Sequence, residues 1–226
     1  MRYRSPDPRC SIAPGQAASV ALAAGGLLLA ALLTSPPAGA FDGGSRVSGS
    51  FGFQALADND MRDTYGMMPQ LGVRFTTPLG ETSEFFVGAG YAWDNGDPYY
   101  GETDFIATDK SRLRTVPIEI GARLTDRNRT QRGFYLGAAL EYLRVREETP
   151  VSGAVDGAAS GWQRFSGWGW GGRLLAGPEW RIAGGRYSIG GEVSLGMRSV
   201  ILHGGHEERK VILSGLNTQV TFSTHL

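Results

Sequence analysis

Apolar and polar residues alternate along most of the chain with the two-residue period of a β-strand. The clearest case is Val116–Leu124, where Ile118 and Ile120 share one face while Glu119 and Arg123 share the other. Successive side chains of a strand point to opposite faces, so this segment has one apolar face and one charged face. Charges in the middle of a strand indicate that the polar face is enclosed in a barrel and that the apolar face meets lipid.

Eight segments show this alternation, each bounded by turn-forming or charged residues. The predicted strands are Gly44–Leu56, Met68–Thr77, Glu84–Trp93, Arg114–Leu124, Phe134–Val145, Trp168–Ile182, Tyr187–Arg198 and Val211–Leu226. Long and short connections alternate between them. The long ones include a polar loop opened by Asp58-Asn59-Asp60, and the segments Asp94–Ser111, Glu147–Ser166 and Ser199–Lys210. With eight strands, this asymmetry places both termini of the chain on the side of the short turns, as in outer-membrane barrels.

Aromatic residues near the strand ends support a membrane position. Trp93, Tyr142, Trp168, Trp180 and Tyr187 occupy such sites, where amphipathic rings suit the headgroup level.

Two prolines conflict with a closed sheet, because each removes a backbone donor from the ladder. Pro117 lies near a strand start, and for Pro178 the sequence suggests a local bulge.

The first forty residues have the features of an export signal. Arg2, Arg4 and Arg9 precede the apolar run Ala17–Leu33, and Ala38-Gly39-Ala40 matches a small-x-small cleavage site. The apolar run is short for a spanning helix and is interrupted by two glycines. We therefore expect residues 1–40 to be a cleaved signal peptide and residues 41–226 to form the barrel domain.

Composition narrows the function classes. Without the signal, the chain has 19 basic and 21 acidic residues and contains no cysteine. This near-neutral balance gives no electrostatic basis for binding nucleic acid. No later apolar run is long enough for a membrane helix, so a membrane form has to span as strands.

The chain resembles the small eight-stranded outer-membrane β-barrels of Gram-negative bacteria, the OmpA-like and opacity-type superfamily. The resemblance rests on the signal, on Val116–Leu124, on Phe134–Tyr142 and on a last strand that runs to the end of the chain. It implies an all-β, eight-stranded, antiparallel up-and-down transmembrane barrel in the cell outer membrane. Members usually finish with an aromatic residue, whereas this chain ends in Leu226.

The inner face of such a barrel carries a near balance of charge. An eight-stranded barrel is just wide enough for side chains to fill it, and buried charges persist when they are paired. We therefore expect a structural charge network in the lumen, with glycines giving the long arginines room. Its predicted members are Arg74, Glu119, Arg123, Glu141, Arg173, Glu179, Glu192 and Arg198.

Other functions have weaker signals. A lumen lined by charge also fits a small or gated pore. A lipid-modifying enzyme would need a base such as His203 or His206 near Ser199, and the same histidines or the Asp58 and Asp94 clusters could attract a metal. A soluble lipid-binding barrel would turn the apolar face inward.

The sequence favours a monomeric, non-enzymatic barrel that displays loops at the cell surface. We predict no catalytic residue, no cofactor site and no metal site. The predicted partners are the outer-membrane bilayer and, during biogenesis, the assembly machinery, with no nucleic acid; the partner of the extracellular loops is left open.

Overall fold

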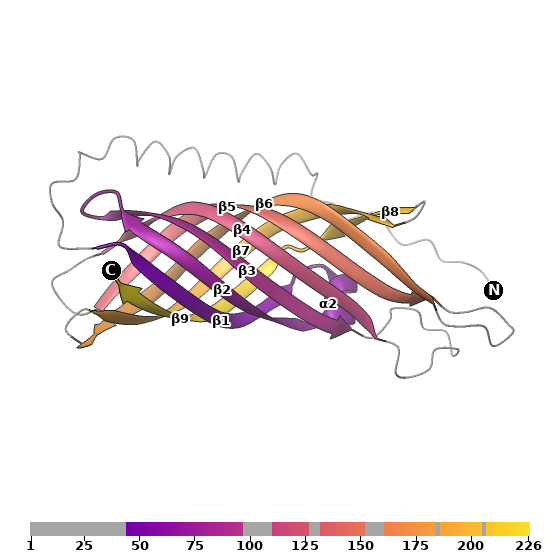
Figure 1. Ribbon diagram of the computed structural model, residues 1–226, viewed down its shortest axis with the longest axis horizontal. Coiled ribbons are helices and arrows are strands. Elements are labelled where there is room, and N and C mark those ends of the chain that lie inside the picture. Colours follow the sequence, from indigo (N-terminus) through magenta and orange to yellow (C-terminus); the bar gives the residue numbers. More distant parts are fainter. Residues whose placement is uncertain (1–43, 97–109, 127–131, 152–160, 184–185, 205–206) are drawn as a thin grey trace, which may run out of the picture.

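The computed structural model describes residues 44–96, 110–126, 132–151, 161–183, 186–204 and 207–226. These residues form one antiparallel sheet and one short helix (Figure 1). The predicted signal peptide, residues 1–40, lies outside the described residues. The elements are β1 (Arg46–Leu56), α2 (Asn59–Tyr65), β2 (Met67–Pro78), β3 (Ser83–Gly96), β4 (Ser111–Thr125), β5 (Arg132–Val151), β6 (Gly161–Ile182), β7 (Tyr187–Gly204), β8 (Glu207–Ile212) and β9 (Gly215–His225).

The sheet closes on itself as an eight-stranded barrel. Each strand pairs with its neighbour in sequence from β1 to β7, and β9 then pairs with both β7 and β1. The segments β8 and β9 lie in one register on β7 and together form the eighth strand, interrupted at Leu213-Ser214. The predicted up-and-down barrel is therefore confirmed. Within the described ranges, no helix combines the length and apolar content needed to cross a bilayer.

The two ends of the barrel differ. Arg46 and His225 lie opposite each other at the end that carries the short connections β2–β3 and β6–β7, here named the turn end. Helix α2 and the β7–β8 hairpin lie at the other end, named the loop end (Figure 1). The start of β1 and the end of β9 thus both lie on the side of the short turns, as expected for an outer-membrane barrel.

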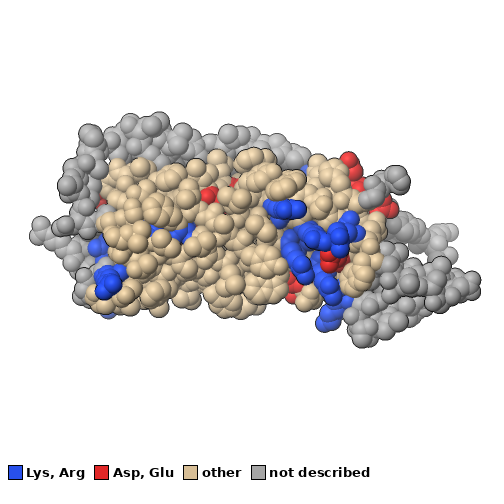
Figure 2. All heavy atoms as spheres, viewed as in Figure 1, with Lys and Arg blue, Asp and Glu red and all other residues tan. Residues whose placement is uncertain are grey.

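The side-chain orientation also agrees with the prediction. Ile118, Leu136 and Val193 point outward and are 54%, 57% and 51% exposed, whereas Glu119 and Glu192 point into the barrel and are buried. Figure 2 shows a broad band with few charged side chains across the middle of the face in view. An apolar exterior of this extent suits lipid and not water, so a soluble barrel with an apolar interior is excluded.

The prolines are accommodated without the expected bulge. Pairing of β6 with β7 stops after the pair of Ala176 with Val193 and resumes at the pair of Glu179 with Gly190. Each strand advances by three residues between these two pairs. No extra residue enters either strand, so the register is kept while the ladder skips Pro178. Pairing of β3 with β4 skips Pro117 in the same way. The sheet therefore gives up a few backbone hydrogen bonds and keeps its alternation of faces.

Parts of two predicted loops are strand, while residues 152–160 and 205–206 of these loops lie outside the described residues. Most of Ser199–Lys210 belongs to the last part of β7 and the first part of β8. These two strands pair as a hairpin whose last pair is Gly204 with Glu207. In the segment Glu147–Ser166, β5 continues to Val151 and β6 begins at Gly161. The predicted loop character of these residues is wrong, because the strands extend past the apolar band at the loop end.

The polar residues Asp58-Asn59-Asp60 begin a helix where a loop was expected. The Asp58 side chain accepts a hydrogen bond from the Met61 amide at 3.1 Å and caps α2. Met61 and Tyr65, one turn apart, then share the buried face of the helix. The helix covers the lumen at the loop end.

Candidate functional site

The barrel lumen is the candidate site, and its side chains form three layers along the axis. Two layers are ionic and lie toward the turn end and the middle, and a small buried cluster of Phe86, Tyr135, Ala139 and Leu175 contacts both of them. The third layer is apolar and lies toward the loop end. Strand alternation supplies every inward side chain, so the layers follow from which residues occupy the inner face at each height.

The layer nearest the turn end is a closed ring of two arginines and two glutamates. Arg46 contacts Glu84 at 2.5 Å and Glu179 at 3.1 Å. Arg123 contacts the same two carboxylates, at 2.7 Å and 3.1 Å. The ring is electrically neutral, and its members come from β1, β3, β4 and β6, so it joins strands across the lumen.

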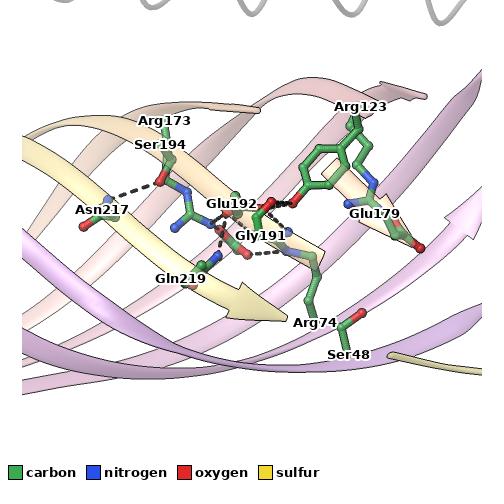
Figure 3. Close-up of polar contacts among 12 residues, drawn as sticks. Ser48, Arg74, Arg123, Arg173, Glu179, Gly191, Glu192, Ser194, Asn217 and Gln219 are labelled. Atoms are coloured by element: carbon green, nitrogen blue, oxygen red, sulfur yellow. Dashed lines mark hydrogen bonds and ion pairs between the residues drawn. The ribbon is translucent and has the colours of Figure 1, made fainter. Parts of the chain in front are cut away.

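The central layer contains three arginines and three glutamates. Arg74 donates to Glu119 at 2.9 Å and, through both terminal nitrogens, to Glu192 at 2.7 Å and 3.2 Å. Arg173 pairs with Glu119 and lies 3.6 Å from Glu141. Figure 3 shows Arg74 and Arg173 approaching Glu192 from opposite sides.

Arg198 completes this layer on the side of β7. It contacts the Glu141 carboxylate at 2.5 Å and 2.8 Å and the Gln54 amide oxygen at 3.0 Å. Glu119 and Glu141 face each other directly across β4 and β5, which would repel without the arginines between them. Each carboxylate of the layer therefore has at least one guanidinium partner, as buried charge requires.

The sequence-predicted lumen residues all lie in these two layers. The structure brings together Arg74, Glu119, Glu141, Arg173, Glu192 and Arg198 in the centre, and Arg123 and Glu179 in the ring. The alternation of the first strand also predicts Arg46 on the inner face, although Arg46 was not among the predicted network members, and Glu84 was not predicted at all. Glu84 stands at a strand end, where the face is hardest to assign.

Small residues give the long side chains room. A Cβ at Gly88 would lie 2.7 Å from a Glu119 carboxylate oxygen, and one at Gly137 would lie 2.7 Å from the Arg123 Cβ. Both approaches are shorter than real Cβ contacts. The inward glycines are thus part of the packing of the charge network.

The layer at the loop end is an apolar core that the sequence analysis did not anticipate. Inward residues of the upper strands pack with the buried face of α2. Its members are Leu56, Met61, Tyr65, Met68, Ala92, Leu113, Leu143, Val145, Phe165, Val200, Leu202, Val211 and Leu213. This core closes the lumen with densely packed side chains that have no affinity for ions.

One polar chain crosses the apolar layer and fixes the helix. The Tyr65 hydroxyl donates to Glu147 at 2.7 Å, and Arg209 of β8 lies 3.3 Å from the same carboxylate. Burial and the neighbouring Glu147 carboxylate raise the pKa of the Tyr65 phenol above its ordinary value of 10.0. The phenol therefore keeps its proton at physiological pH and donates a hydrogen bond to Glu147.

A small cavity of about 40 Å³ remains beside the central layer. Its lining includes Gln54, Gln70, Arg74, Glu119 and Gln219. The side-chain nitrogen of Gln70 is buried without a protein partner. The polar lining and the size suit one or two ordered water molecules.

The residues weighed for catalysis or metal binding do not converge. His203 is exposed and lies 3.2 Å from Glu208, while His206 and Asp97, the last residue of the Asp94-Asn95-Gly96-Asp97 cluster, lie outside the described residues. Asp58 caps α2, and Asp94 accepts from the amide of Asn95 at 2.7 Å. Among the described residues, no three histidine, cysteine or acidic side chains are grouped closely enough to hold a metal ion.

Sequence comparison adds no relative. No protein-family model matches the chain, and no curated protein is detectably similar to it in sequence.

Solved structures show the same architecture. A major outer membrane protein from Thermus thermophilus has a TM-score of 0.55 at 11% identity, with 82% of this chain and 100% of that chain covered. The outer membrane protein OprG from Pseudomonas aeruginosa has a TM-score of 0.52 at 13% identity, covering 85% and 98%. Neisserial surface protein A has a TM-score of 0.51 at 9% identity, covering 80% and 97%. The chain therefore has the fold of the small eight-stranded outer-membrane β-barrels.

Proposed function

We propose that this protein is a non-enzymatic outer-membrane barrel whose sealed lumen makes it a rigid scaffold for surface-exposed segments. The observation that carries the proposal is the continuous filling of the lumen, first by the ionic layers and then by the apolar core under α2. A packed interior leaves the loop end as the part that can act on other molecules.

The closed lumen argues against a constitutive pore. An ion that moved along the axis would have to displace paired arginines and glutamates and then cross a layer of leucine, methionine and phenylalanine side chains. Each step is costly, because the charges lose their partners and the ion loses its water. Wide porin-type barrels have more strands and a water-filled interior.

The same proposal covers biogenesis and assembly. The chain is exported through its signal peptide, is inserted into the outer-membrane bilayer by the assembly machinery and functions as a monomer without nucleic acid. The apolar exterior and the closed sheet support this, because the barrel leaves no strand edge of its spanning region free for a second chain.

Conductance in a planar bilayer tests the sealed lumen. The wild-type barrel should show no stable current steps. A double variant of the apolar layer, Leu143→Gly with Phe165→Gly, removes two large plug side chains and should give at most brief, irregular current steps, because the ionic layers still fill the rest of the lumen. The matched double variant Leu136→Gly with Val193→Gly removes outward side chains and should remain closed. Regular steps from the wild-type protein would establish a pore and overturn the scaffold proposal.

A further inference from the structure

Five arginines cluster on the outer surface of the barrel at the loop end. They are Arg112 and Arg114 of β4, Arg144 and Arg146 of β5, and Arg164 of β6. All five belong to the outward faces, since their neighbours Leu113, Val145 and Phe165 point into the apolar core. Figure 2 shows basic side chains gathered at the loop end, beyond the uncharged band. We call these five residues the arginine patch.

The patch has far more positive than negative charge. Glu148 is its one carboxylate among the described residues, and it lies 3.0 Å from Arg146, 3.1 Å from Arg164 and 4.0 Å from Arg112. Five guanidinium groups against one carboxylate leave an excess of four positive charges. Within the described part of the chain, Arg114 and Arg144 have no ion-pair partner.

The strand register increases the repulsion. Arg114 lies directly opposite Arg146 across β4 and β5. Like charges at directly opposed positions destabilise a sheet, and guanidinium groups remain charged at any physiological pH. The fold therefore maintains a local electrostatic cost that an external anion would remove.

Aromatic contacts give the height of the patch relative to a bilayer. The Arg144 guanidinium lies 5.1 Å from the ring centre of Trp168, and Tyr142 lies beside Trp168 and Trp170 at 5.2 Å and 4.7 Å. The exposed apolar residue Ile118 lies directly opposite Tyr142, and the exposed Leu140 follows two positions nearer the turn end. Tryptophan and tyrosine mark the interface between hydrocarbon and water, so the patch lies at the headgroup level of the leaflet at the loop end.

We propose that the arginine patch binds the phosphate groups of an anionic glycolipid in the outer leaflet. Guanidinium groups bind phosphate oxygens in paired, charge-assisted hydrogen bonds, and several of them at one headgroup neutralise a doubly phosphorylated lipid. The charge excess, the opposed arginines and the headgroup depth all fit this ligand. This inference depends on the proposed outer-membrane location, because the lipid meets the patch only when the barrel spans the bilayer.

The test uses the refolded full-length mature barrel and purified lipid A as the probe. Binding is measured for bisphosphorylated lipid A, for the same lipid with its phosphates removed, and for inorganic phosphate. We expect the double variant Arg114→Gln with Arg146→Gln to lose about tenfold or more in affinity for bisphosphorylated lipid A. The dephosphorylated lipid should bind the wild-type barrel as weakly as the variant binds the intact lipid.

The matched control removes two arginines elsewhere. Arg62 of α2 and Arg186 of the β6–β7 turn are exposed and lie outside the patch, so Arg62→Gln with Arg186→Gln should leave the affinity unchanged. Equal binding by both double variants, or binding that is indifferent to the lipid phosphates, would overturn the proposal. Inorganic phosphate that binds as tightly as the lipid would make the patch a simple anion site and would also overturn it.

A second readout separates this proposal from the proposed function. A closed barrel migrates differently on a gel before and after boiling. If every variant keeps this behaviour, a change in lipid binding reports on the patch alone. If the wild-type barrel lacks the behaviour and is absent from outer-membrane fractions, the membrane location itself is wrong.

Discussion

The hydroxyl of Tyr135 lies 3.1 Å from the Glu192 carboxylate, directly beside the gap that Pro178 leaves in the pairing of β6 and β7. The same hydroxyl lies 3.4 Å from the carbonyl oxygen of Gly191, in the unpaired part of β7. A side chain from β5 thus contacts both the exposed backbone and the nearest carboxylate where the ladder is interrupted. This contact explains how a closed sheet tolerates a proline in a spanning strand.

Removal of this hydroxyl should weaken the barrel at that gap. Tyr135→Phe leaves Glu192 with its Arg74 and Gln219 partners but frees the carbonyl. We expect a loss of about 1 kcal/mol in the free energy of unfolding, the usual value of one buried hydrogen bond. Urea unfolding in detergent micelles measures it. Tyr142→Phe, which changes a tyrosine on the outer face, should have no comparable effect, and equal losses would contradict the assigned role.

Breaking an ion pair of the central layer should cost much more. Arg74→Gln leaves the buried carboxylates of Glu119 and Glu192 without one of their guanidinium partners. Removal of one member of a buried pair costs about 3–5 kcal/mol. The exposed pair of Arg62 with Asp63 provides the control, since Arg62→Gln should change the free energy of unfolding by less than about 1 kcal/mol. Similar values for both variants would mean that the lumen is hydrated and open.

A charge on the apolar band should interfere with insertion. Ile118→Arg places a guanidinium in the middle of the outward face, where a basic residue destabilises a barrel by about 2–4 kcal/mol. Met67→Arg places the same charge at the loop end, on an outward residue at the start of β2, and should be tolerated. The fraction of protein that shows heat-modifiable migration after refolding into vesicles compares the two. A tolerated Ile118→Arg would contradict the membrane orientation.

The contact of Tyr65 with Glu147 predicts a stability change at high pH. The folded state favours the protonated phenol, because burial and Glu147 raise its pKa. The stabilisation is complete below pH 10.0, the ordinary pKa of a tyrosine, and is lost as the pH rises above it. Absorbance of tyrosinate in the folded barrel should show a late phase to which the Tyr65 phenol contributes. Tyr65→Phe should reduce the amplitude of that phase by one phenol, whereas an unchanged curve would contradict the contact.

Export predicts a defined N-terminus. Cleavage after Ala40 would start the mature protein at Phe41. Mass spectrometry of the protein from outer-membrane fractions identifies the first residue. Ala38→Arg with Ala40→Arg should block cleavage and leave the precursor, and an intact N-terminus in the wild-type protein would show an anchor instead of a signal.

Much of the fold was predictable because the barrel obeys one simple rule over the apolar band. Across the apolar band, most outward residues are apolar and most inward residues are polar or small, with Phe86 and Leu175 as inward exceptions, so the period of two is visible in the sequence. This period predicts which residues face lipid and which charged residues face the lumen. It does not predict the individual ion pairs, because alternation does not determine which inward arginine reaches which glutamate across the lumen.

The loop end was mispredicted because its interior is apolar. Around Val200, Ile201 and Leu202 both faces of β7 carry apolar side chains, so the alternation disappears although the strand continues. The helix was hidden for a different reason. Asp58-Asn59-Asp60 has the composition of a loop, and only the capping position of Asp58 and the spacing of Met61 and Tyr65 indicate a helical turn.

The ring of Arg46, Glu84, Arg123 and Glu179 has a consequence for the folding pathway. Its members come from β1, β3, β4 and β6, and β1 and β6 are not neighbours in the sheet. A partly assembled, open sheet would therefore hold two arginines and two glutamates with only some of their contacts made. The last strand pairing that closes the barrel and the ring therefore form together. This raises the free energy of half-closed intermediates and makes closure an all-or-none event.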